Sequence, residues 1–286
     1  MNLQNQILKI KYVVYKIMND YLLANKNYWN ELALIHQVSD YYSINLFEQG
    51  KTTLRTIEFN DLGDITGKSI LHLQCHIGLD TLSLVRDKKA IATAIDFSDT
   101  SIVIAKELAE KNNIRCEFHC LNIGDVYNTL KQKFDIVFTS YGALIWISDL
   151  NKWAEDIASM LEDGGFFYIV DEHPFSAIFN SSKNKKIKIT YPYFNIGNPY
   201  STNNIHSYTG DSNLLNNNTQ YKWGHSLSEI FASIQNSGLV IESFGEYYKS
   251  FYNTLPNMTL KDDGWWYLNK HSESIPLLFT LKAFKK

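Results

Sequence analysis

Short apolar runs alternate with helical stretches through the middle of the chain. Five runs are expected to be strands, at Ser69–Leu73, Ile91–Asp96, Cys116–Cys120, Phe134–Thr139 and Gly165–Val170. Helices are expected between them, at Thr81–Arg86, Thr100–Asn112 and Leu150–Leu161. Strands that alternate with helices in this way are typical of βα units, and they predict an α/β fold with a parallel sheet.

The N-terminal stretch follows a different pattern. Residues 1–26 carry an apolar stripe at helical spacing, which predicts an appended helix. This helix is expected to pack on the main domain or on a second copy of the chain, as a homodimer, and a membrane surface is the alternative. Residues 27–50 are rich in aromatic and polar side chains. We therefore expect an N-terminal helical and aromatic cap at 1–50 and a main domain at 51–286.

The alternating rhythm is lost after Val170, where asparagine, serine and tyrosine become frequent. A compact domain rarely holds such a long irregular loop without a functional reason, so residues 174–222 are expected to be a lid insertion. Order returns at Ser226-Leu-Ser-Glu229, a capping-box pattern that predicts a helix. Two more strands are expected at Leu239–Tyr247 and Ile275–Phe284, which brings the predicted sheet to seven strands.

The composition of the chain makes some classes of function less plausible than others. The 286 residues include 27 basic and 30 acidic side chains, which give a formal net charge of -3. Such a chain lacks the positive field that holds a phosphate backbone, so nucleic acid is not an expected partner. The apolar runs are far below the roughly 20 residues needed to span a bilayer, and no signal-peptide pattern is present. We therefore expect no membrane association and a cytoplasmic location.

The three cysteines, Cys75, Cys116 and Cys120, are expected to be reduced core thiols. Their number is odd, and they form no C-x-x-C pair. A metal site at Cys116 and Cys120 is the alternative, although no His-x-x-x-His pattern accompanies these two residues. The sequence therefore predicts no metal site.

Candidate cofactor residues lie at the ends of the first two expected strands. The first strand runs into Leu71–Gly78, and the second ends at Asp96, 18 residues after Gly78. This spacing suits a doubly wound fold in which a cofactor approaches the first helix and a carboxylate accepts hydrogen bonds from both ribose hydroxyls. Two observations weaken the pattern. Gln74 and His76 stand where glycines usually allow close backbone approach, and a strand-end aspartate is often a helix cap.

Longer motifs add weight to this interpretation. They are Leu71–Thr81, spelled L-H-L-Q-C-H-I-G-L-D-T, and then Ala94–Ser98, Phe134–Gly142, Leu161–Gly165, Glu172–Pro174, His36–Tyr42, Tyr221–His225 and Asp263–Trp266. With these motifs the chain, from about Tyr28 to Lys285, resembles the class I S-adenosylmethionine (SAM)-dependent methyltransferases, and in particular a bacterial small-molecule subgroup with the L-H-L-Q-C-H-x-G-L-D-T motif. The resemblance implies a Rossmann-like sheet of seven strands, mostly parallel with the last strand antiparallel, and helices on both faces. It also implies SAM as cofactor and S-adenosylhomocysteine as product.

The resemblance implies cofactor contacts at individual positions. They are Gln74, Cys75, His76 and Gly78 beside the methionine portion, Asp96 at the ribose, Phe97, Asn122 and Ile123 at the adenine, and Thr139, Ser140 and Tyr141 beneath the methionine and sulfonium. Asn122 stands where the family often has an acidic residue, and its side-chain oxygen can still accept a hydrogen bond. His72 replaces the usual acidic residue of the first motif, which affects the normal bridge to the SAM ammonium group.

Candidate catalytic and substrate-binding residues lie beyond these motifs. His173, directly after the fifth strand, is the best-placed general base, and Glu172 could orient it or bind a substrate amine. The alternative for His173 is a hydrogen bond to backbone before Pro174. The residues expected to bind the substrate are His36, Tyr41, Tyr42, Trp146, Trp223 and His225. The aromatic rings among them either pack a lid over the core or form a flat pocket for a ring or an ammonium group.

The predicted reaction is methyl transfer from SAM to N, O or S of a small molecule, by in-line displacement within a lid-covered aromatic pocket. A SAM-binding protein without enzymatic activity is one alternative. Another is a nicotinamide-dependent oxidoreductase, which would need G-x-G-x-x-G after the first strand, where only Gly78 is present. A nucleic-acid methyltransferase is disfavoured, because the fourth strand ends in Thr-Ser-Tyr-Gly and lacks an Asn/Asp-Pro-Pro-aromatic motif.

Overall fold

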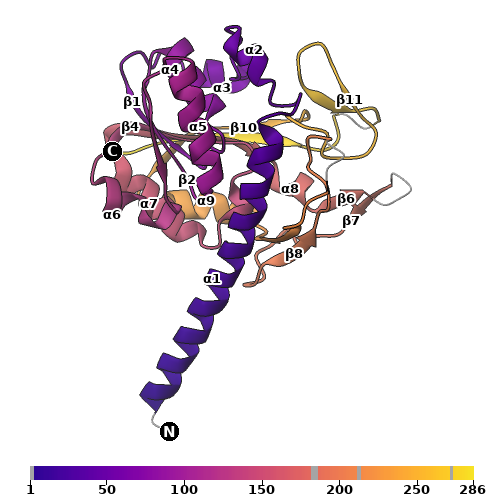
Figure 1. The fold of residues 1–286 in the computed structure, drawn as a ribbon. Helices are drawn as coiled ribbons and strands as arrows, with labels where there is room; N and C mark the ends of the chain where they lie inside the picture. The colour runs from indigo at the N-terminus through magenta and orange to yellow at the C-terminus, as the bar shows by residue number, and fades with distance from the viewer. Residues whose placement is uncertain (1–2, 182–185, 211–213, 271–272) are drawn as a thin grey trace.

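The computed structural model describes residues 3–181, 186–210, 214–270 and 273–286. At its centre is a seven-stranded sheet with the strand order β10-β13-β5-β4-β1-β2-β3 (Figure 1). The strands are β1 (Ser69–Leu73), β2 (Ile91–Asp96), β3 (Glu117–Cys120), β4 (Phe134–Ser140), β5 (Leu161–Glu172), β10 (Val240–Tyr247) and β13 (Leu278–Phe284). The last strand, β13, runs antiparallel to β5 and β10, and the other neighbours are parallel. The predicted α/β Rossmann-like sheet is confirmed.

Helices cover both faces of this sheet. They are α1 (Leu3–His36), α2 (Ile44–Glu48), α3 (Thr56–Asp61), α4 (Leu79–Lys88), α5 (Asp99–Lys111), α6 (Val126–Leu130), α7 (Leu150–Met160), α8 (Pro174–Ala177) and α9 (Leu227–Asn236), with single turns η1 (Ile123–Asp125) and η2 (Leu144–Trp146). Leu71 and Val137 pack with α7 and α9 on one face. Ile70 and Ile136 pack with α3 and α4 on the other. Because successive side chains along a strand point to opposite faces of the sheet, the sheet has a hydrophobic core on each face.

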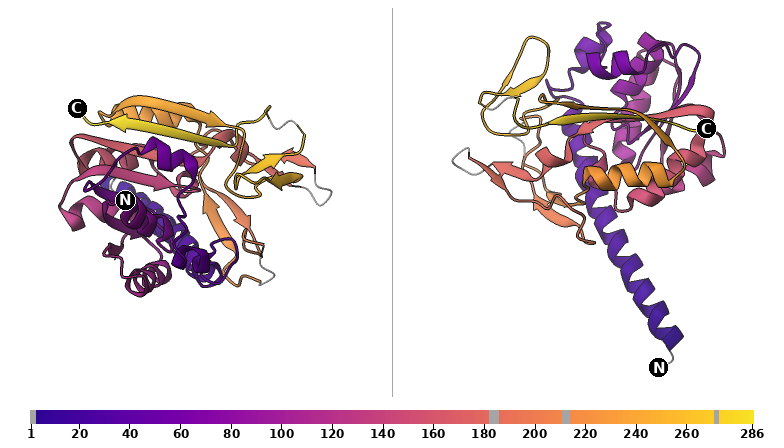
Figure 2. Two further views of the ribbon diagram at one scale, coloured as in Figure 1. Left: turned by 90° about the horizontal axis from the view of Figure 1, so that it is seen from above. Right: turned by 180° about the vertical axis from the view of Figure 1, so that it is seen from behind.

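The stretch expected to be an irregular lid contains regular structure in its described part. After α8 come two hairpins, formed by β6 (Phe179–Ser181) with β7 (Ile187–Ile189) and by β8 (Tyr200–Asn203) with β9 (Thr219–Lys222). A third hairpin, β11 (Met258–Leu260) with β12 (Trp266–Leu268), lies in the connection from β10 to β13. The three hairpins lie on the same side of the domain (Figures 1 and 2). Whether 174–222 acts as a lid stays a prediction.

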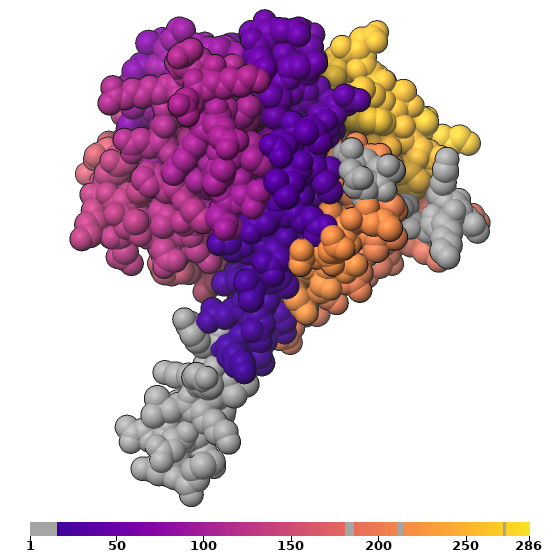
Figure 3. Space-filling view, viewed as in Figure 1, coloured from indigo at the N-terminus to yellow at the C-terminus, as the bar shows by residue number. Residues whose placement is uncertain are grey.

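The N-terminal helix is longer than expected, because α1 continues through the aromatic segment to His36. Its C-terminal half packs on the domain, where Ser98 Oγ donates to Asn30 and Asn25 bonds to the backbone of Tyr221. Figure 3 shows this half as a band between the sheet domain and the segment around β9. The N-terminal half extends away from the rest of the chain (Figures 1 and 2). A homodimer through this helix stays a prediction.

The largest differences from the predicted strand boundaries lie in β5 and β13. The helix expected at Leu150–Leu161 ends at Met160, and β5 begins at once with Leu161, four residues before the expected Gly165. Gly164 lies inside this strand with φ of 79°, near an irregularity in the pairing of β4 with β5. The last strand begins at Leu278, three residues later than expected. No helix in the described part of the chain has the length and apolarity needed to cross a bilayer.

Candidate active site

The turn between β1 and α4 has a backbone conformation that favours glycine. Gln74, His76 and Gly78 have φ of 54°, 51° and 78°, so every second residue is left-handed. This conformation costs a residue with a side chain about 1 kcal/mol or more. Side-chain bonds offset the cost, since Gln74 Nε2 donates to the backbone oxygen of Ala143 and His76 Nδ1 lies 3.2 Å from Ser101 Oγ. The loop therefore keeps the shape of a glycine-rich turn without its full set of glycines.

Gly78 lets this loop pack directly on α5 and β3. A Cβ atom at this position would lie 2.7 Å from the ring of Phe118 and 2.9 Å from the Cβ atom of Ala105. Both contacts are too short for real carbon atoms. The close approach that requires a glycine at position 78 is therefore to the neighbouring helix and strand.

Asp96 ends β2 opposite the loop. Its Oδ2 accepts a hydrogen bond from the backbone N–H of His76 at 2.9 Å, and its Oδ1 accepts one from that of Ser98 at 2.8 Å. Ser98 caps α5 by accepting from the backbone N–H of Ser101, so the cap is not Asp96. Burial raises the pKa of Asp96 to about 6, against the effect of these backbone donors. Each carboxylate oxygen keeps a lone pair for a further donor.

Two cavities lie on either side of Asp96. The larger one, the main cavity, has a volume of about 300 Å³, and the smaller one, the side cavity, has a volume of about 160 Å³. Gln74, Asp96, Phe97 and Trp146 border both. The cavities are therefore neighbours at the end of β2, and Asp96 lies in the wall of each.

Nearly all residues expected to contact the cofactor border these cavities. Those at the main cavity are Gln74, Cys75, His76, Gly78, Asp96, Phe97, Ser140 and Tyr141, and those found only at the side cavity are Asn122 and Ile123. Thr139 is buried within β4 and borders neither cavity. Gln74 Oε1 is buried and has no hydrogen-bond partner among the described residues. Because Gln74 borders both cavities, a bound cofactor can supply the missing donor.

A pair of histidines connects α1 to the loop. His36 Nδ1 and His76 Nε2 lie 2.8 Å apart, and the other nitrogen of His36 lies 3.0 Å from Ser207 Oγ. Burial lowers the pKa of His36 to about 2 and that of His76 to about 3, so both rings are neutral at pH 7. His36, expected to bind substrate, does not border the main or the side cavity. It holds together the N-terminal helix, the loop and the 174–222 insertion.

The other residues expected to bind substrate fall into two groups. Tyr41, Tyr42 and Trp146 border the main cavity. Trp223 and His225 lie outside it, in the segment that follows β9. The backbone N–H of Trp223 donates to the carbonyl of Ile145, and His225 Nε2 lies 2.7 Å from that of Ile147. These two residues attach the insertion to η2, next to Trp146.

His173 and Glu172 also lie outside the main and side cavities. His173 Nδ1 accepts a hydrogen bond from the backbone N–H of Phe175 at the start of α8, and its Nε2 lies 2.9 Å from Glu246 Oε1 on β10. Glu172 accepts a hydrogen bond from Thr254 Oγ1 at 2.9 Å, and burial raises its pKa. Since both ring nitrogens of His173 are bonded to the protein, its position favours support of α8 over proton transfer.

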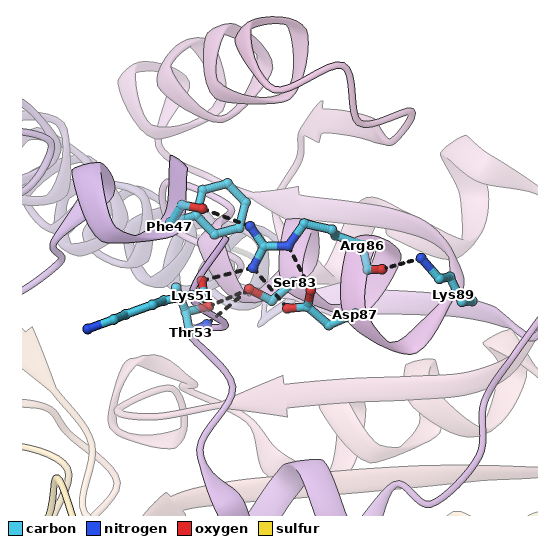
Figure 4. A network of polar contacts seen from close by, with 7 residues as sticks. All are labelled: Phe47, Lys51, Thr53, Ser83, Arg86, Asp87 and Lys89. Carbon is cyan, nitrogen blue, oxygen red and sulfur yellow. Dashed lines mark hydrogen bonds and ion pairs between the residues drawn. The ribbon is translucent and has the colours of Figure 1, made fainter. Parts of the chain in front are cut away.

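A polar network fixes the segment before α3 onto α4 (Figure 4). The guanidinium of Arg86 donates to the backbone oxygens of Phe47 and Lys51, at 2.8 Å each. The backbone N–H of Thr53 donates to Ser83 Oγ at 3.1 Å. The side chain of Thr53 is thereby held at the first turn of α4, at the wall of the main cavity.

Three charged residues of the main cavity, Asp80, Arg55 and the exposed Lys51, were not expected from the sequence. Asp80 lies inside the matched L-H-L-Q-C-H-x-G-L-D-T motif, so its acidic side chain in the first turn of a helix was a usable signal. Arg55 carried no such signal, because its guanidinium bonds to the backbone oxygens of Phe251 and Gly264, about 200 residues away. Tyr208 and Phe251 also border the main cavity, again from distant parts of the chain.

All three cysteines are free thiols. Cys116 Sγ lies 3.3 Å from the backbone oxygen of Ala92, and Cys120 Sγ lies 3.6 Å from that of Phe97. Burial raises the pKa of the Cys75 thiol, which borders the main cavity. Within the described ranges, no group of His, Cys, Asp and Glu side chains is arranged to hold a metal ion.

Comparison with known proteins connects this site to a family. Residues 70–165 match the model of a methyltransferase domain, a range that runs from β1 into β5 and contains the loop, Asp96 and Asn122. A ubiquinone biosynthesis O-methyltransferase of Coxiella burnetii is 27% identical over 147 residues, which are 51% of this chain and 56% of that protein. The chain therefore spans little more than half the length of this curated relative.

Solved structures share the fold at low sequence identity. An S-adenosylmethionine dependent methyltransferase candidate from Listeria monocytogenes has a TM-score of 0.56 and 18% identity, over 80% of this chain and 96% of that chain. The geranyl diphosphate C-methyltransferase from Streptomyces coelicolor A3(2), solved with S-adenosyl-L-homocysteine, has a TM-score of 0.52 and 11% identity, over 80% of this chain and 73% of that chain. At such identities, the likeness establishes the fold.

Proposed function

Because the chain carries a methyltransferase domain in the fold of the class I SAM-dependent methyltransferases, we propose that it transfers the methyl group of SAM to N, O or S of a small molecule. The observation that carries the proposal is the pair of neighbouring cavities with Asp96 in the wall of each. In SAM, a ribose joins an adenine to a methionine portion, and a carboxylate is well suited to the ribose diol. The side cavity would then hold the adenine, and the main cavity the methionine portion.

Several groups of this chain are suited to holding SAM. Asp96 has free lone pairs for the ribose hydroxyls, and the unpartnered Oε1 of Gln74 can accept a hydrogen bond from the ligand. In the side cavity, the Asn122 side-chain oxygen can accept from the adenine amino group, next to the backbone of Ile123. When bound, SAM supplies a methyl group on a cationic sulfonium. The task left to the protein is to align the acceptor and exclude water.

The acceptor would enter the aromatic part of the main cavity. The rings that border it are Tyr41, Tyr42, Tyr141, Tyr208 and Phe251. Tyr41 and Tyr141 donate their hydroxyls to the backbone oxygen of Phe251 and to Glu58, and the hydroxyls of Tyr42 and Tyr208 bond to each other. Since these polar ends are engaged within the protein, the rings offer apolar faces to a flat or cationic acceptor. Tyr208 belongs to the 174–222 insertion, which supports its proposed role as a lid.

The chemistry proposed here does not depend on His173. An acceptor that arrives with a free lone pair, such as a neutral amine or a thiolate, needs no general base. The other candidate function is that of a protein that binds SAM without transferring its methyl group.

We also propose a cytoplasmic location, because three free thiols suit a reducing compartment.

Calorimetric titration and a transfer assay test the proposed function. The chain is titrated with SAM, with S-adenosylhomocysteine and with NADH, and is then incubated with methyl-labelled SAM and a metabolite extract. We expect binding of SAM and S-adenosylhomocysteine, no binding of NADH, and label in a small-molecule product. Asp96→Ala is expected to weaken SAM binding by about 1–3 kcal/mol, because a charge-assisted contact to the ribose is lost.

Each other outcome has a defined meaning. Binding of SAM without any labelled product would favour the non-enzymatic candidate. Binding of NADH and not of SAM would overturn the proposed function. Asp163→Asn serves as the matched control for Asp96→Ala, since this carboxylate is largely exposed, and it should leave SAM affinity unchanged.

A further inference from the structure

Asp80 is a carboxylate without an ion-pair partner among the described residues. It borders the main cavity from the first turn of α4. Its two oxygens accept hydrogen bonds from neutral hydroxyl groups, those of Thr53 at 2.7 Å and Ser140 at 3.3 Å. A carboxylate within a protein is normally neutralised by a basic group, because burial of a lone charge is costly. Asp80 is therefore ready to receive a cation from the cavity.

Arg55 is a cation at the wall of the same cavity. Its guanidinium donates to the backbone oxygens of Phe251 and Gly264, at 3.0 and 2.6 Å, and lies 4.8 Å from the centre of a Trp265 ring. These two carbonyls use two of its five N–H donors. Burial raises the pKa of Asp80, and the hydrogen bonds to its carboxylate and the charge of Arg55 oppose this effect only in part. No ion pair joins Asp80 and Arg55. Asp80 and Arg55 thus border one cavity without an ion pair between them. The other charged residues of this cavity are Asp96, which the proposed function places at the ribose, and the exposed Lys51.

The first strand presents no charge to this cavity. His72, at the position where the resemblance expects an acidic residue, lies between Thr81 Oγ1 at 2.8 Å and Ser140 Oγ at 3.2 Å. Burial lowers the pKa of His72 to about 3, so the ring is neutral at pH 7. The Ser140 hydroxyl lies between His72 and Asp80, because it is within hydrogen-bonding distance of both. The carboxylate missing from β1 is therefore replaced by one in the first turn of α4.

We propose that Asp80 and Arg55 form the seat for the amino acid end of SAM, with Asp80 receiving the ammonium group and Arg55 the carboxylate. The inference rests on the proposed function, since it assumes that the main cavity holds the methionine portion. A zwitterion carries both charges close together, and it matches a cavity in which Asp80 and Arg55 offer charges of opposite sign without an ion pair between them. The contacts of Thr53 with Ser83 in Figure 4 keep the Asp80 carboxylate oriented toward the cavity.

The proposed contact of Asp80 with the SAM ammonium group is tested by calorimetry with two ligands. S-adenosylhomocysteine carries the zwitterionic end, and 5′-methylthioadenosine has the same thioether nucleoside without it. Asp80→Asn is expected to weaken S-adenosylhomocysteine about 10- to 100-fold, the range of a charged hydrogen bond, and to leave 5′-methylthioadenosine within about twofold. Asp96→Asn is the contrasting control, since both ligands carry the ribose and should weaken alike.

The proposed contact of Arg55 with the SAM carboxylate is tested with a second pair of ligands. Decarboxylated SAM keeps the ammonium group and the sulfonium of SAM but lacks the carboxylate. Arg55→Gln is expected to weaken SAM about tenfold or more and to leave decarboxylated SAM unchanged, whereas Asp80→Asn should weaken both. Binding of 5′-methylthioadenosine reports that each variant is folded, and Asp80→Ser replaces Asp80→Asn if the latter fails this check.

The outcomes separate this inference from the proposed function. If the unmodified chain binds neither S-adenosylhomocysteine nor 5′-methylthioadenosine, the proposed function fails. If it binds both, and Asp80→Asn weakens both equally or neither, the seat is overturned while the proposed function stands. A variant that keeps its S-adenosylhomocysteine affinity and shows only a raised KM for the acceptor would also overturn the seat, because Asp80 would then serve the acceptor.

Discussion

The two cavities beside Asp96 differ in how many parts of the chain build them. The side cavity is bordered by residues between Ile95 and Asp156, together with Leu22, Asn25 and Gln74. The main cavity draws on α1, the segment before α3, the loop after β1, the end of β4, Tyr208 and Phe251. Neighbouring βα units thus build most of the side cavity, and α1 adds Leu22 and Asn25, whereas the main cavity depends much more on how distant segments pack together.

The cavities also differ in their charges. In the side cavity, Asp149 caps α7 and Asp156 pairs with Lys152, so these acidic side chains have partners. In the main cavity, Asp80 and Arg55 have no ion-pair partner among the residues described. This difference supports the proposed placement of the uncharged adenine in the side cavity and of the charged amino acid end of SAM in the main cavity.

The largest expected effect comes from Gly78→Ala at the loop beside the main cavity. The new Cβ atom would meet Phe118 and Ala105 at less than 3 Å, on a left-handed backbone. We expect the free energy of unfolding to fall by about 2–4 kcal/mol, from overpacking and backbone strain together. Denaturant unfolding followed by circular dichroism measures the change.

Gly264→Ala is the matched control for Gly78→Ala. Gly264 is also left-handed, with φ of 79°, but the nearest atom to its Cβ position is 3.9 Å away. Backbone strain alone should cost about 1 kcal/mol there. Equal losses in the two variants would show that the packing of the loop on α5 contributes little.

The next effect is a pH dependence that both cavities share through Asp96. Burial raises the pKa of this carboxyl to about 6, and the ionised form is the one that accepts from the ribose hydroxyls. Affinity for 5′-methylthioadenosine should therefore be constant well above pH 6 and fall as the pH drops below 6, by up to about tenfold, or 1.4 kcal/mol, for each pH unit. Calorimetry between pH 5 and 8 measures it, and a flat profile would contradict the ribose assignment.

A smaller effect is expected at His173, outside the main and side cavities. His173→Ala removes the acceptor for the Phe175 N–H at the start of α8, so the free energy of unfolding should fall by about 1 kcal/mol. His173→Asn keeps an acceptor at this position and should lose less. With a methylated substrate in hand, turnover of both variants should equal that of the unmodified chain from pH 6 to 9. A loss of turnover in both would restore His173 as a base.

The smallest effect is expected in the side cavity, at Asn122. Its side-chain oxygen already accepts from the backbone N–H of Gly124, at 3.4 Å. Asn122→Ala should therefore weaken S-adenosylhomocysteine by about 0.5–1 kcal/mol, the net value of a neutral hydrogen bond. Asn122→Asp, which keeps the acceptor, is the matched variant and should bind at least as well as the unmodified chain. An affinity in Asn122→Ala equal to that of the unmodified chain would place the adenine elsewhere.

Much of the side cavity could be predicted from the sequence. The first five strands of the sheet along the chain were expected within a few residues, except that β5 extends beyond both predicted ends. Asp96 was expected at the tip of the second strand, where it lies. These features depend on short-range patterns, namely the period of two along a strand and the turn at the end of each strand. Resemblance then identified Asn122 and Ile123, which border the side cavity.

The main cavity could be predicted only in part. The loop residues were found because the motif that contains them is continuous in sequence. Asp80 lies in that same motif and was missed, because a carboxylate in the first turn of a helix is ordinarily a favourable partner for the helix dipole. Its lack of a cationic partner appears only when the surrounding side chains are in place.

The sequence alone determined the strands of the central sheet, most of the helices around it and the position of Asp96, because hydrophobic periodicity and capping act over a few residues. Tertiary structure decided which distant groups meet at the main cavity. Arg55 bonds to Gly264 across 209 positions of the chain, and His36 meets Ser207 across 171. Such contacts arise from the packing of the cap, the hairpins and the sheet, whose combined burial outweighs the entropy of closing long loops. No local pattern encodes them.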